Sequence, residues 1–151
     1  MPDYDFITTY TGVHFFPTRP DPDGVRIVDV AHALSLLCRG NGHVKTFFSV
    51  GQHCLHCARE ALARNCSRRV ALACLLHDAS EAYLSDVPRP FKQHLPQYRA
   101  LEDRLLAAVY QKYLGGPLTQ EEQRQVKQID DDMLWYDLAT LLHDPPARPA
   151  P

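Results

Sequence analysis

The sequence predicts an all-α protein with one compact domain, and three observations lead to this prediction. The chain has 151 residues, a length that is enough for one domain with a buried core. Hydrophobic residues make up 45% of the chain and charged residues 23%, which is typical of globular proteins. Apolar residues recur at helical spacing in several segments, and glycine- and proline-rich stretches separate these segments.

Residues 1–26 are expected to form an N-terminal arm. Residues 4–16 are rich in aromatic and β-branched side chains around Gly12, so they fit either a short β-hairpin or an extended segment. Residues 17–24 contain three prolines and one glycine, which predicts a loop before the first helix.

Three helices are expected next, over residues 27–38, 50–65 and about 67–77. Asp29 and Ser49 are candidate N-caps for the first and second of these helices. The glycine-rich residues 39–43 should end the first helix. The third helix has few polar positions, and it should therefore be deeply buried, with an end at His77 or slightly beyond.

Two more helices are expected, over residues 98–114 and about 119–142. Between the two groups of helices, Pro88 and Pro90 exclude a regular helix over residues 85–96. The glycine pair at residues 115 and 116 ends the fourth helix, and the sequence "TQEE" from Thr119 resembles a capping box. The helical domain is thus expected over residues 27–142, with a flexible tail over residues 143–151.

Charge and composition exclude several classes of protein. The net charge is −2, which does not indicate a nucleic-acid-binding or membrane-binding surface. No apolar run reaches the ~18 residues of a membrane span, and the N-terminus lacks the apolar region of a signal peptide. The five cysteines, an odd number, favour reduced thiols over a disulfide framework. We therefore expect a cytoplasmic protein.

The stretch "LLHDASEAYLSDVPRPFK", residues 75–92, carries the strongest functional signal. The most apolar helix ends in His77 and Asp78, and two more carboxylates follow at Glu81 and Asp86. An isolated His-Asp pair is most often a polar helix end. Here a buried imidazole and carboxylate would be costly unless they bind something, and a divalent metal takes both kinds of ligand.

Two further residues would complete a metal site. His53 lies in the second expected helix, and Asp130 lies in the last one within the acidic run "IDDD". Each is by itself more typical of a polar helix surface. Together with His77 and Asp78, they form a His, His-Asp, Asp set that three helices would supply.

A second metal hypothesis uses "HCLHC", residues 53–57. Cys54 and Cys57 have the spacing of a structural zinc site, and His56 lies between them. Such a site needs a second pair at a matching spacing, and Cys66 and Cys74 do not supply it. On a helix, Cys54 and Cys57 more commonly face the core as small apolar residues.

The order His … His-Asp … Asp resembles the HD superfamily of metal-dependent phosphohydrolases. The stretches "AHALSLLCRGNGH…FFSVGQHC", "LLHDASEAYLSDVPRPFK" and "VKQID" look like the small bacterial and phage branch that is related to 5′-deoxyribonucleotidases. The resemblance covers about residues 28–140, and its most specific part is "HDASEAYLSDVPRPFK". It implies a compact helical bundle of the HD type.

The resemblance also implies roles for individual residues. It assigns one divalent transition metal (Mn, Co, Zn, Fe or Ni, with Mg as a further option) to the ligands His53, His77, Asp78 and Asp130. Glu81 matches the catalytic carboxylate, and Asp86 matches a carboxylate that positions the sugar or the attacking water. Arg39 lies near the position of the arginine that grips the phosphate. Asp131 and Asp132 are alternatives to Asp130, and the branch usually has a glutamate where Gln52 stands.

The spacing gives an independent reason for a role of Glu81. If the third helix continues past Asp78, Glu81 lies one turn beyond the His-Asp pair and on the same face. It can then orient a water molecule, or take its proton, without binding the metal itself. The phosphate oxygens need cations, and the candidates are Arg39, Lys45 and Lys92, with His43 beside them in the glycine-rich turn.

The expected function is the hydrolysis of a (deoxy)ribonucleoside 5′-monophosphate to a nucleoside and phosphate. One alternative is a triphosphohydrolase that releases triphosphate from a nucleoside triphosphate. A second alternative is a regulatory module that binds metal and nucleotide without turnover, although a binding site has no need of Glu81. The expected partner is a small nucleotide, with no nucleic acid or membrane, and the resemblance also implies a homodimer.

Overall fold

The structure is a computed structural model that describes residues 4–151, so residues 1–3 of the expected arm lie outside the described residues. Within this range, seven α-helices and one two-stranded antiparallel hairpin form the regular structure, with two short 3-10 helices. The elements are β1 (Ile7–Thr8), β2 (His14–Phe15), η1 (Pro22–Gly24), α1 (Ile27–Leu36), η2 (Arg39–Gly42), α2 (Val50–Ala63), α3 (Arg68–Leu76), α4 (Glu81–Leu84), α5 (Arg89–Lys92), α6 (Pro96–Leu114) and α7 (Gln120–Leu141). The expected all-α architecture is therefore confirmed, and of the two alternatives for the N-terminal arm the structure has the hairpin.

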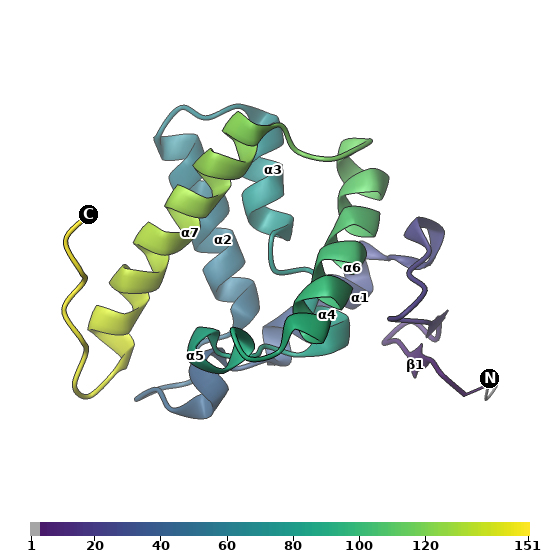
Figure 1. The fold of residues 1–151 in the computed structure, drawn as a ribbon, viewed down its shortest axis with the longest axis horizontal. Helices are drawn as coiled ribbons and strands as arrows, with labels where there is room; N and C mark the ends of the chain where they lie inside the picture. Colours follow the sequence, from purple (N-terminus) through teal and green to yellow (C-terminus); the bar gives the residue numbers. More distant parts are fainter. Residues whose placement is uncertain (1–3) are drawn as a thin grey trace.

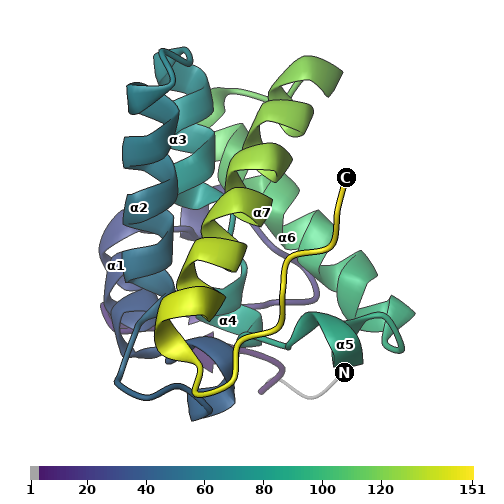
Figure 2. The ribbon, with the colours of Figure 1, turned by 90° about the vertical axis from the view of Figure 1, so that its left-hand side faces the viewer.

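Helix α2 is the centre of the bundle. It packs against α3, and α1 and α7 both contact it. Helix α6 packs against α3, and the short helices α4 and α5 contact α1 and α6, respectively. Figures 1 and 2 show α2, α3 and α7 side by side, and Figure 1 shows the hairpin and the C-terminal segment at opposite ends of the molecule.

The apolar spacing of the sequence explains this packing. On α2, the buried residues recur every three or four positions, so they share one face: Val50, His53, Cys54, Cys57 and Ala61. All five cysteines are free thiols, and Cys54 and Cys57 lie in the core, as the sequence favoured. None of the helices within residues 4–151 is long and apolar enough to cross a membrane.

The expected caps at Ser49 and Thr119 are confirmed. The Ser49 hydroxyl accepts a hydrogen bond from the Gln52 backbone N–H, and the Gln52 side chain accepts one from the Ser49 N–H. Thr119 and Glu122 form the same reciprocal capping box at the start of α7. These caps satisfy backbone N–H groups that have no partner inside the helix.

The prediction that Asp29 caps the first helix is wrong. Helix α1 already begins at Ile27, so Asp29 lies inside its first turn and is only 3% exposed. Its carboxylate instead accepts hydrogen bonds from the backbone N–H (2.7 Å) and the hydroxyl (3.0 Å) of Thr11. Asp29 therefore attaches the hairpin loop to α1.

The expected ends of the first and third helices also differ from the structure. Helix α1 ends at Leu36, because Cys38 is extended and forms a β-bridge with Ser49. Helix α3 ends at Leu76, and the chain continues through hydrogen-bonded turns to α4 instead of as one helix past Asp78.

The proline-rich residues 85–96 form no long helix, but they contain the single turn α5. Pro90 fits into this turn, and Pro96 begins α6, because the first turn of a helix does not use its backbone N–H groups. The segment 143–151 is irregular and exposed.

Removal of the Asp29 carboxylate should loosen the hairpin. We expect Asp29→Ala to lower the free energy of unfolding by about 1–3 kcal/mol, because the Thr11 backbone N–H and hydroxyl lose their partner. Urea unfolding followed by circular dichroism measures this change, and Asp23→Ala at a nearby exposed position is the matched control. Equal unfolding free energies for the two variants would contradict the assigned role.

Candidate metal centre

Four side chains from three helical regions converge on one point inside the bundle. His53 comes from α2, His77 and Asp78 follow the end of α3, and Asp130 comes from α7. Asp130 Oδ1 lies 2.8 Å from His53 Nε2 and 3.1 Å from His77 Nε2. Asp78 Oδ2 lies 3.2 Å from His77 Nε2 and 3.7 Å from His53 Nε2.

These separations are those of ligands around a single ion. Two atoms that each lie ~2.1 Å from a metal are about 3.0 Å apart at a right angle and about 3.4 Å apart at the tetrahedral angle. The four measured distances, from 2.8 to 3.7 Å, scatter around this range. The cluster could therefore hold a metal ion without a large rearrangement.

Hydrogen bonds at the opposite ring nitrogens orient both imidazoles. His77 Nδ1 donates to the backbone carbonyl of Cys74 at 2.6 Å, and His53 Nδ1 lies 3.2 Å from Asp137 Oδ2. Because a carbonyl oxygen only accepts, Nδ1 of His77 carries a proton and Nε2 points into the cluster. A carboxylate or carbonyl behind the ring in this way is typical of metal-binding histidines.

The sequence analysis missed Asp137. It is 4% exposed and lies seven residues after Asp130, which places the two carboxylates two turns apart on the same face of α7. The seven-residue spacing from Asp130 could have indicated a second carboxylate on the same face. It did not identify Asp137 by itself, because other acidic residues also lie in this helix.

Cys57 also belongs to the cluster. Its sulfur lies 3.6 Å from His53 Nε2, and it lies within 4.8 Å of the ligand atoms of His77 and Asp130. Burial and the nearby Asp130 and Asp78 carboxylates raise the pKa of the Cys57 thiol well above its ordinary value. Cys57 is therefore a neutral thiol in this structure, and the imidazoles and carboxylates are the stronger candidate ligands.

Protonation balances the negative charge of the cluster. Burial alone would lower the pKa of His77, but the carboxylates of Asp78 and Asp130 outweigh burial and raise that pKa to about 9. Burial would raise the pKa of Asp130, but its hydrogen bonds to His53 and His77 hold the pKa far below the ordinary range. At neutral pH a protonated His77 thus lies beside an ionised Asp130.

The other two aspartates of "IDDD" pair with arginines and not with the histidines. Asp131 pairs with Arg89 at 2.8 Å, and Asp132 pairs with Arg64 at 2.8 Å and with Arg148 at 2.7 Å. Of the three, Asp130 lies at the histidines. The choice of Asp130 from the sequence agrees with this placement.

A pocket of about 440 Å³ opens onto the cluster. Its polar wall contains the carboxylates of Asp78, Glu81, Asp86, Asp130 and Asp137 and the cations of Arg39, Arg89 and Lys92. Its apolar wall comes largely from α7 and includes Leu134, Trp135 and Leu138. The pocket therefore combines a charged floor with a surface that suits an apolar or aromatic group.

Glu81 lies at the floor of this pocket and is 5% exposed. Its Oε2 atom is buried without a hydrogen-bond partner among residues 4–151. Burial raises the pKa of Glu81 well above its ordinary value, and the neighbouring carboxylates of Asp78 and Asp86 raise it further. A buried carboxyl group with a raised pKa and an unused oxygen is suited to proton transfer.

The structure brings only some of the expected phosphate-binding residues to the pocket. Arg39 lines it, and its guanidinium lies 3.8 Å from Asp137. Lys92 also lines it, but its amine is bound to Glu102 at 3.0 Å.

His43 and Lys45 are exposed and do not line the pocket. The turn between them and Arg39 has positive φ angles at Gly40, Asn41 and Gly42, and Val44, which lies between the two, lines the pocket in their place. Gln52, which stands where the family usually has glutamate, caps α2. Arg89, which the sequence analysis did not single out, is the third cation of the pocket.

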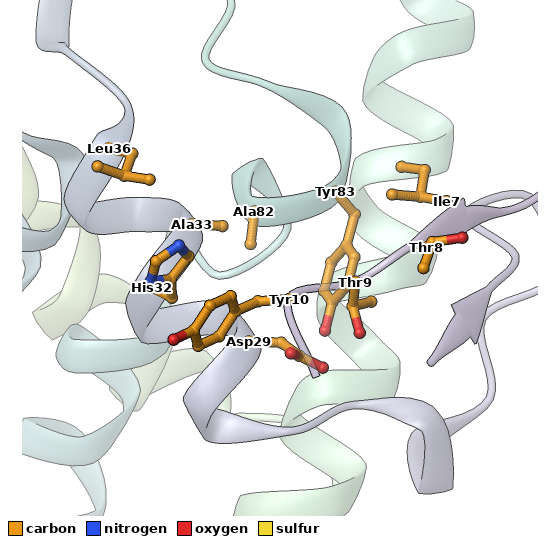
Figure 3. Close-up of a pocket in the computed structure, with 10 residues that line it drawn as sticks. All are labelled: Ile7, Thr8, Thr9, Tyr10, Asp29, His32, Ala33, Leu36, Ala82 and Tyr83. Carbon is orange, nitrogen blue, oxygen red and sulfur yellow. The ribbon is translucent and has the colours of Figure 1, made fainter. Parts of the chain in front are cut away.

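A second hollow of about 330 Å³ lies on the other side of α4 (Figure 3). The hairpin, α1 and α4 form its walls, and Ala82 and Tyr83 of α4 contribute to them. Two of its titratable groups already have structural contacts, because Asp29 binds Thr11 and the His32 ring stacks on the Tyr10 ring with centroids 3.7 Å apart, whereas the buried Tyr83 hydroxyl has no hydrogen-bond partner within residues 4–151. The two hollows have no lining residue in common; of the four candidate ligands, Asp78 and Asp130 line the larger hollow and none lines the smaller one.

In the absence of metal, the raised pKa of His77 predicts a pH-dependent stability. The stabilisation is fully present below the unfolded-state pKa of about 6.5, and it is lost as the pH rises through about 9. This difference in pKa corresponds to about 3 kcal/mol. Urea unfolding with a chelator between pH 6 and pH 10 should show the loss, and His77→Gln should flatten it. The same pH dependence in both proteins would refute the assignment.

The comparisons with known proteins give relatives but no activity. No protein-family model matches the chain. Uncharacterized protein YfdR of Escherichia coli is 38% identical over 108 residues, which are 72% of this chain and 58% of YfdR. Uncharacterized protein RCAP_rcc00048 of Rhodobacter capsulatus is 36% identical over 118 residues, which are 74% of this chain and 60% of that protein. The match thus spans less than two thirds of each curated relative. The names of these two relatives state no function.

Proposed function

We propose that the protein is a metal-dependent hydrolase of the HD type that cleaves a nucleoside 5′-monophosphate to a nucleoside and phosphate. One observation carries the proposal: two imidazole nitrogens and two carboxylates converge within 3.7 Å beside a pocket, and Glu81 adjoins them. The resemblance of residues 28–140 to that superfamily points to the same chemistry.

The ligand set fits one divalent transition metal. Imidazole and carboxylate ligands suit Mn, Fe, Co, Ni and Zn, and the contacts of both Nδ1 atoms leave the Nε2 atoms for an ion. An ion held by His53, His77, Asp78 and Asp130 would supply Lewis-acid stabilisation of the phosphoester and would activate water.

Side chains of the pocket would transfer the proton and bind the sugar and the phosphate. With its raised pKa and free Oε2 atom, Glu81 is placed to hold a proton and to exchange it with a water or with the leaving oxygen. Asp86 lines the pocket next to Glu81 and would orient the sugar or the water. Arg39 would bind a phosphate oxygen, since its guanidinium lies at the inner end of the pocket beside Asp137.

The charge of the pocket favours a monophosphate over a triphosphate. Five carboxylates and three cations line it, so a divalent ion would bring the ionised groups close to neutrality. A phosphate monoester carries about two negative charges at neutral pH, whereas a triphosphate carries about two more. A pocket that is close to neutral has no excess cation for these two additional charges. The apolar wall with Trp135 offers a stacking surface for the base.

A substrate screen tests the proposal directly. Purified protein is incubated with nucleoside mono-, di- and triphosphates in the presence of Mn, Co, Mg or Zn, and both nucleoside release and phosphate-chain products are measured. We expect nucleoside and inorganic phosphate from a monophosphate. Release of intact triphosphate would assign the triphosphohydrolase reaction instead, and binding without turnover would assign a regulatory module.

The metal site can be tested separately from activity. We expect Asp130→Ala to lose at least tenfold in Mn²⁺ or Zn²⁺ affinity, because a ligand that contacts both histidines is removed. Asp132→Ala, two residues away and paired with Arg64 and Arg148, is the matched control and should retain the metal. Isothermal titration calorimetry and elemental analysis measure this. Equal metal content in the two variants would exclude the proposed ligand set.

The catalytic role of Glu81 predicts a change in turnover without a change in metal content. Glu81→Gln keeps the size of the buried side chain but cannot exchange a proton, so kcat should fall by roughly 10²- to 10⁴-fold. Glu60→Gln on α2, a partly exposed residue that pairs with Arg64 and does not line the pocket, is the control. Loss of the metal in Glu81→Gln would make Glu81 a ligand, and unaltered turnover would remove it from the mechanism.

A further inference from the structure

We propose that Arg89 is a second phosphate-binding residue besides Arg39, at the mouth of the pocket, and that Asp130 and Asp131 hold its guanidinium until a phosphate replaces them. The inference rests on the proposed function, because it names the group that recognises the phosphate of the same substrate. The sequence resemblance assigns this task to Arg39 and does not single out Arg89.

The position of Arg89 is set by the short helix α5. Pro88 is the N-cap of this single turn and Pro90 lies in it, so the backbone on both sides of Arg89 is restricted. The Arg89 side chain is 54% exposed and lines the pocket. Its head group is therefore at the entrance, where it can move, while its backbone is held.

The contacts of Arg89 place it directly beside the metal-ligand cluster. Asp130 faces the two histidines with Oδ1, and its other oxygen, Oδ2, lies 3.2 Å from Arg89 Nη2. The same Nη2 atom donates to Asp131 Oδ1 at 2.8 Å. One carboxylate thus connects the cluster with the guanidinium. A phosphate that enters the pocket toward the cluster passes within reach of Arg89.

Arg89 also has unused donors. Within residues 4–151, its hydrogen bonds are both made by Nη2, so Nε and Nη1 remain available. A guanidinium can bind two phosphate oxygens in parallel, and a phosphate dianion is a stronger partner than an exposed carboxylate. Exposed ion pairs such as that between Arg89 and Asp131 contribute little stability, so their exchange for a phosphate costs little.

The other two cations of the pocket are less free to move. The amine of Lys92 binds both oxygens of Glu102, at 3.0 and 3.3 Å, and lies 5.7 Å from the centre of the Tyr98 ring. Arg39 lies beside the buried Asp137, whose carboxylate orients His53. Movement of Arg39 would disturb a metal-binding imidazole, whereas movement of Arg89 leaves both histidines in place.

The test uses inorganic phosphate, the expected product, as the probe. Its affinity for Mn²⁺-loaded protein is measured by calorimetry, together with the KM for a nucleoside monophosphate. Arg89→Ala should weaken phosphate binding and raise KM by roughly 10- to 100-fold, because the pair of charge-assisted hydrogen bonds from the guanidinium to the phosphate is lost. Arg89→Lys should recover only part of the affinity, since an ammonium cannot form the fork. Arg99→Ala, an exposed arginine on α6, is the matched control.

A second variant distinguishes phosphate binding from a purely structural role. Asp131→Asn removes a competitor for the guanidinium, so phosphate should bind more tightly, by about 2- to 5-fold. If Arg89 only stabilised α5 against α7, both Arg89→Ala and Asp131→Asn would lower the melting temperature and neither would change phosphate affinity. That result would overturn the inference, as would an unchanged KM in Arg89→Ala. Wild-type protein that hydrolyses no nucleotide would instead refute the proposed function.

Discussion

The structure depends on one buried imidazole. His53 is 0% exposed, and two carboxylates of α7 lie at its two nitrogens, Asp137 at Nδ1 and Asp130 at Nε2. A polar ring in the core is unfavourable unless both nitrogens are satisfied. Because the two aspartates are seven residues apart, both can face α2 only when α7 presents that one face. The position and rotation of α7 against α2 therefore follow from His53.

The same interaction explains how a cluster of buried charged groups can exist inside a small bundle. Apolar contacts hold the far ends of the helices, for example Ala61 of α2 and Val126 of α7 in the common core. Between these contacts, the termination of α3 at Leu76 places the next two residues, His77 and Asp78, against α7 instead of in a further helical turn. The charged residues are thus concentrated where three helical regions meet, and each is satisfied by another member of the group.

Local sequence patterns predicted the helices better than they predicted the contacts between distant parts of the chain. The caps at Ser49 and Thr119 and the apolar faces follow from residues close together in the chain, and these predictions are confirmed. Aspartate is as common at an N-cap as serine or threonine, so the residue type of Asp29 also suggested a cap. Its partner is instead Thr11, which is 18 residues away in the hairpin loop. Arg89 could not be identified, because its contacts depend on where a single helical turn between two prolines lies relative to α7. The roles of Asp29 and Arg89 therefore depend on contacts between distant parts of the chain, which local patterns do not predict.

The short helix α4 separates the candidate metal centre from the N-terminal hairpin. Glu81 at its start faces the metal-ligand cluster, whereas Ala82 and Tyr83 line the hollow beside the hairpin, and Tyr83 stacks on Phe15 at 4.0 Å. The hairpin is in turn bound to α1 by Asp29. Packing on the far side therefore restrains the backbone of Glu81, and its carboxyl group can remain buried with an unused oxygen. A proton-transfer group needs this combination of a fixed position and an unsatisfied atom, and the N-terminal arm contributes to it without lining the pocket.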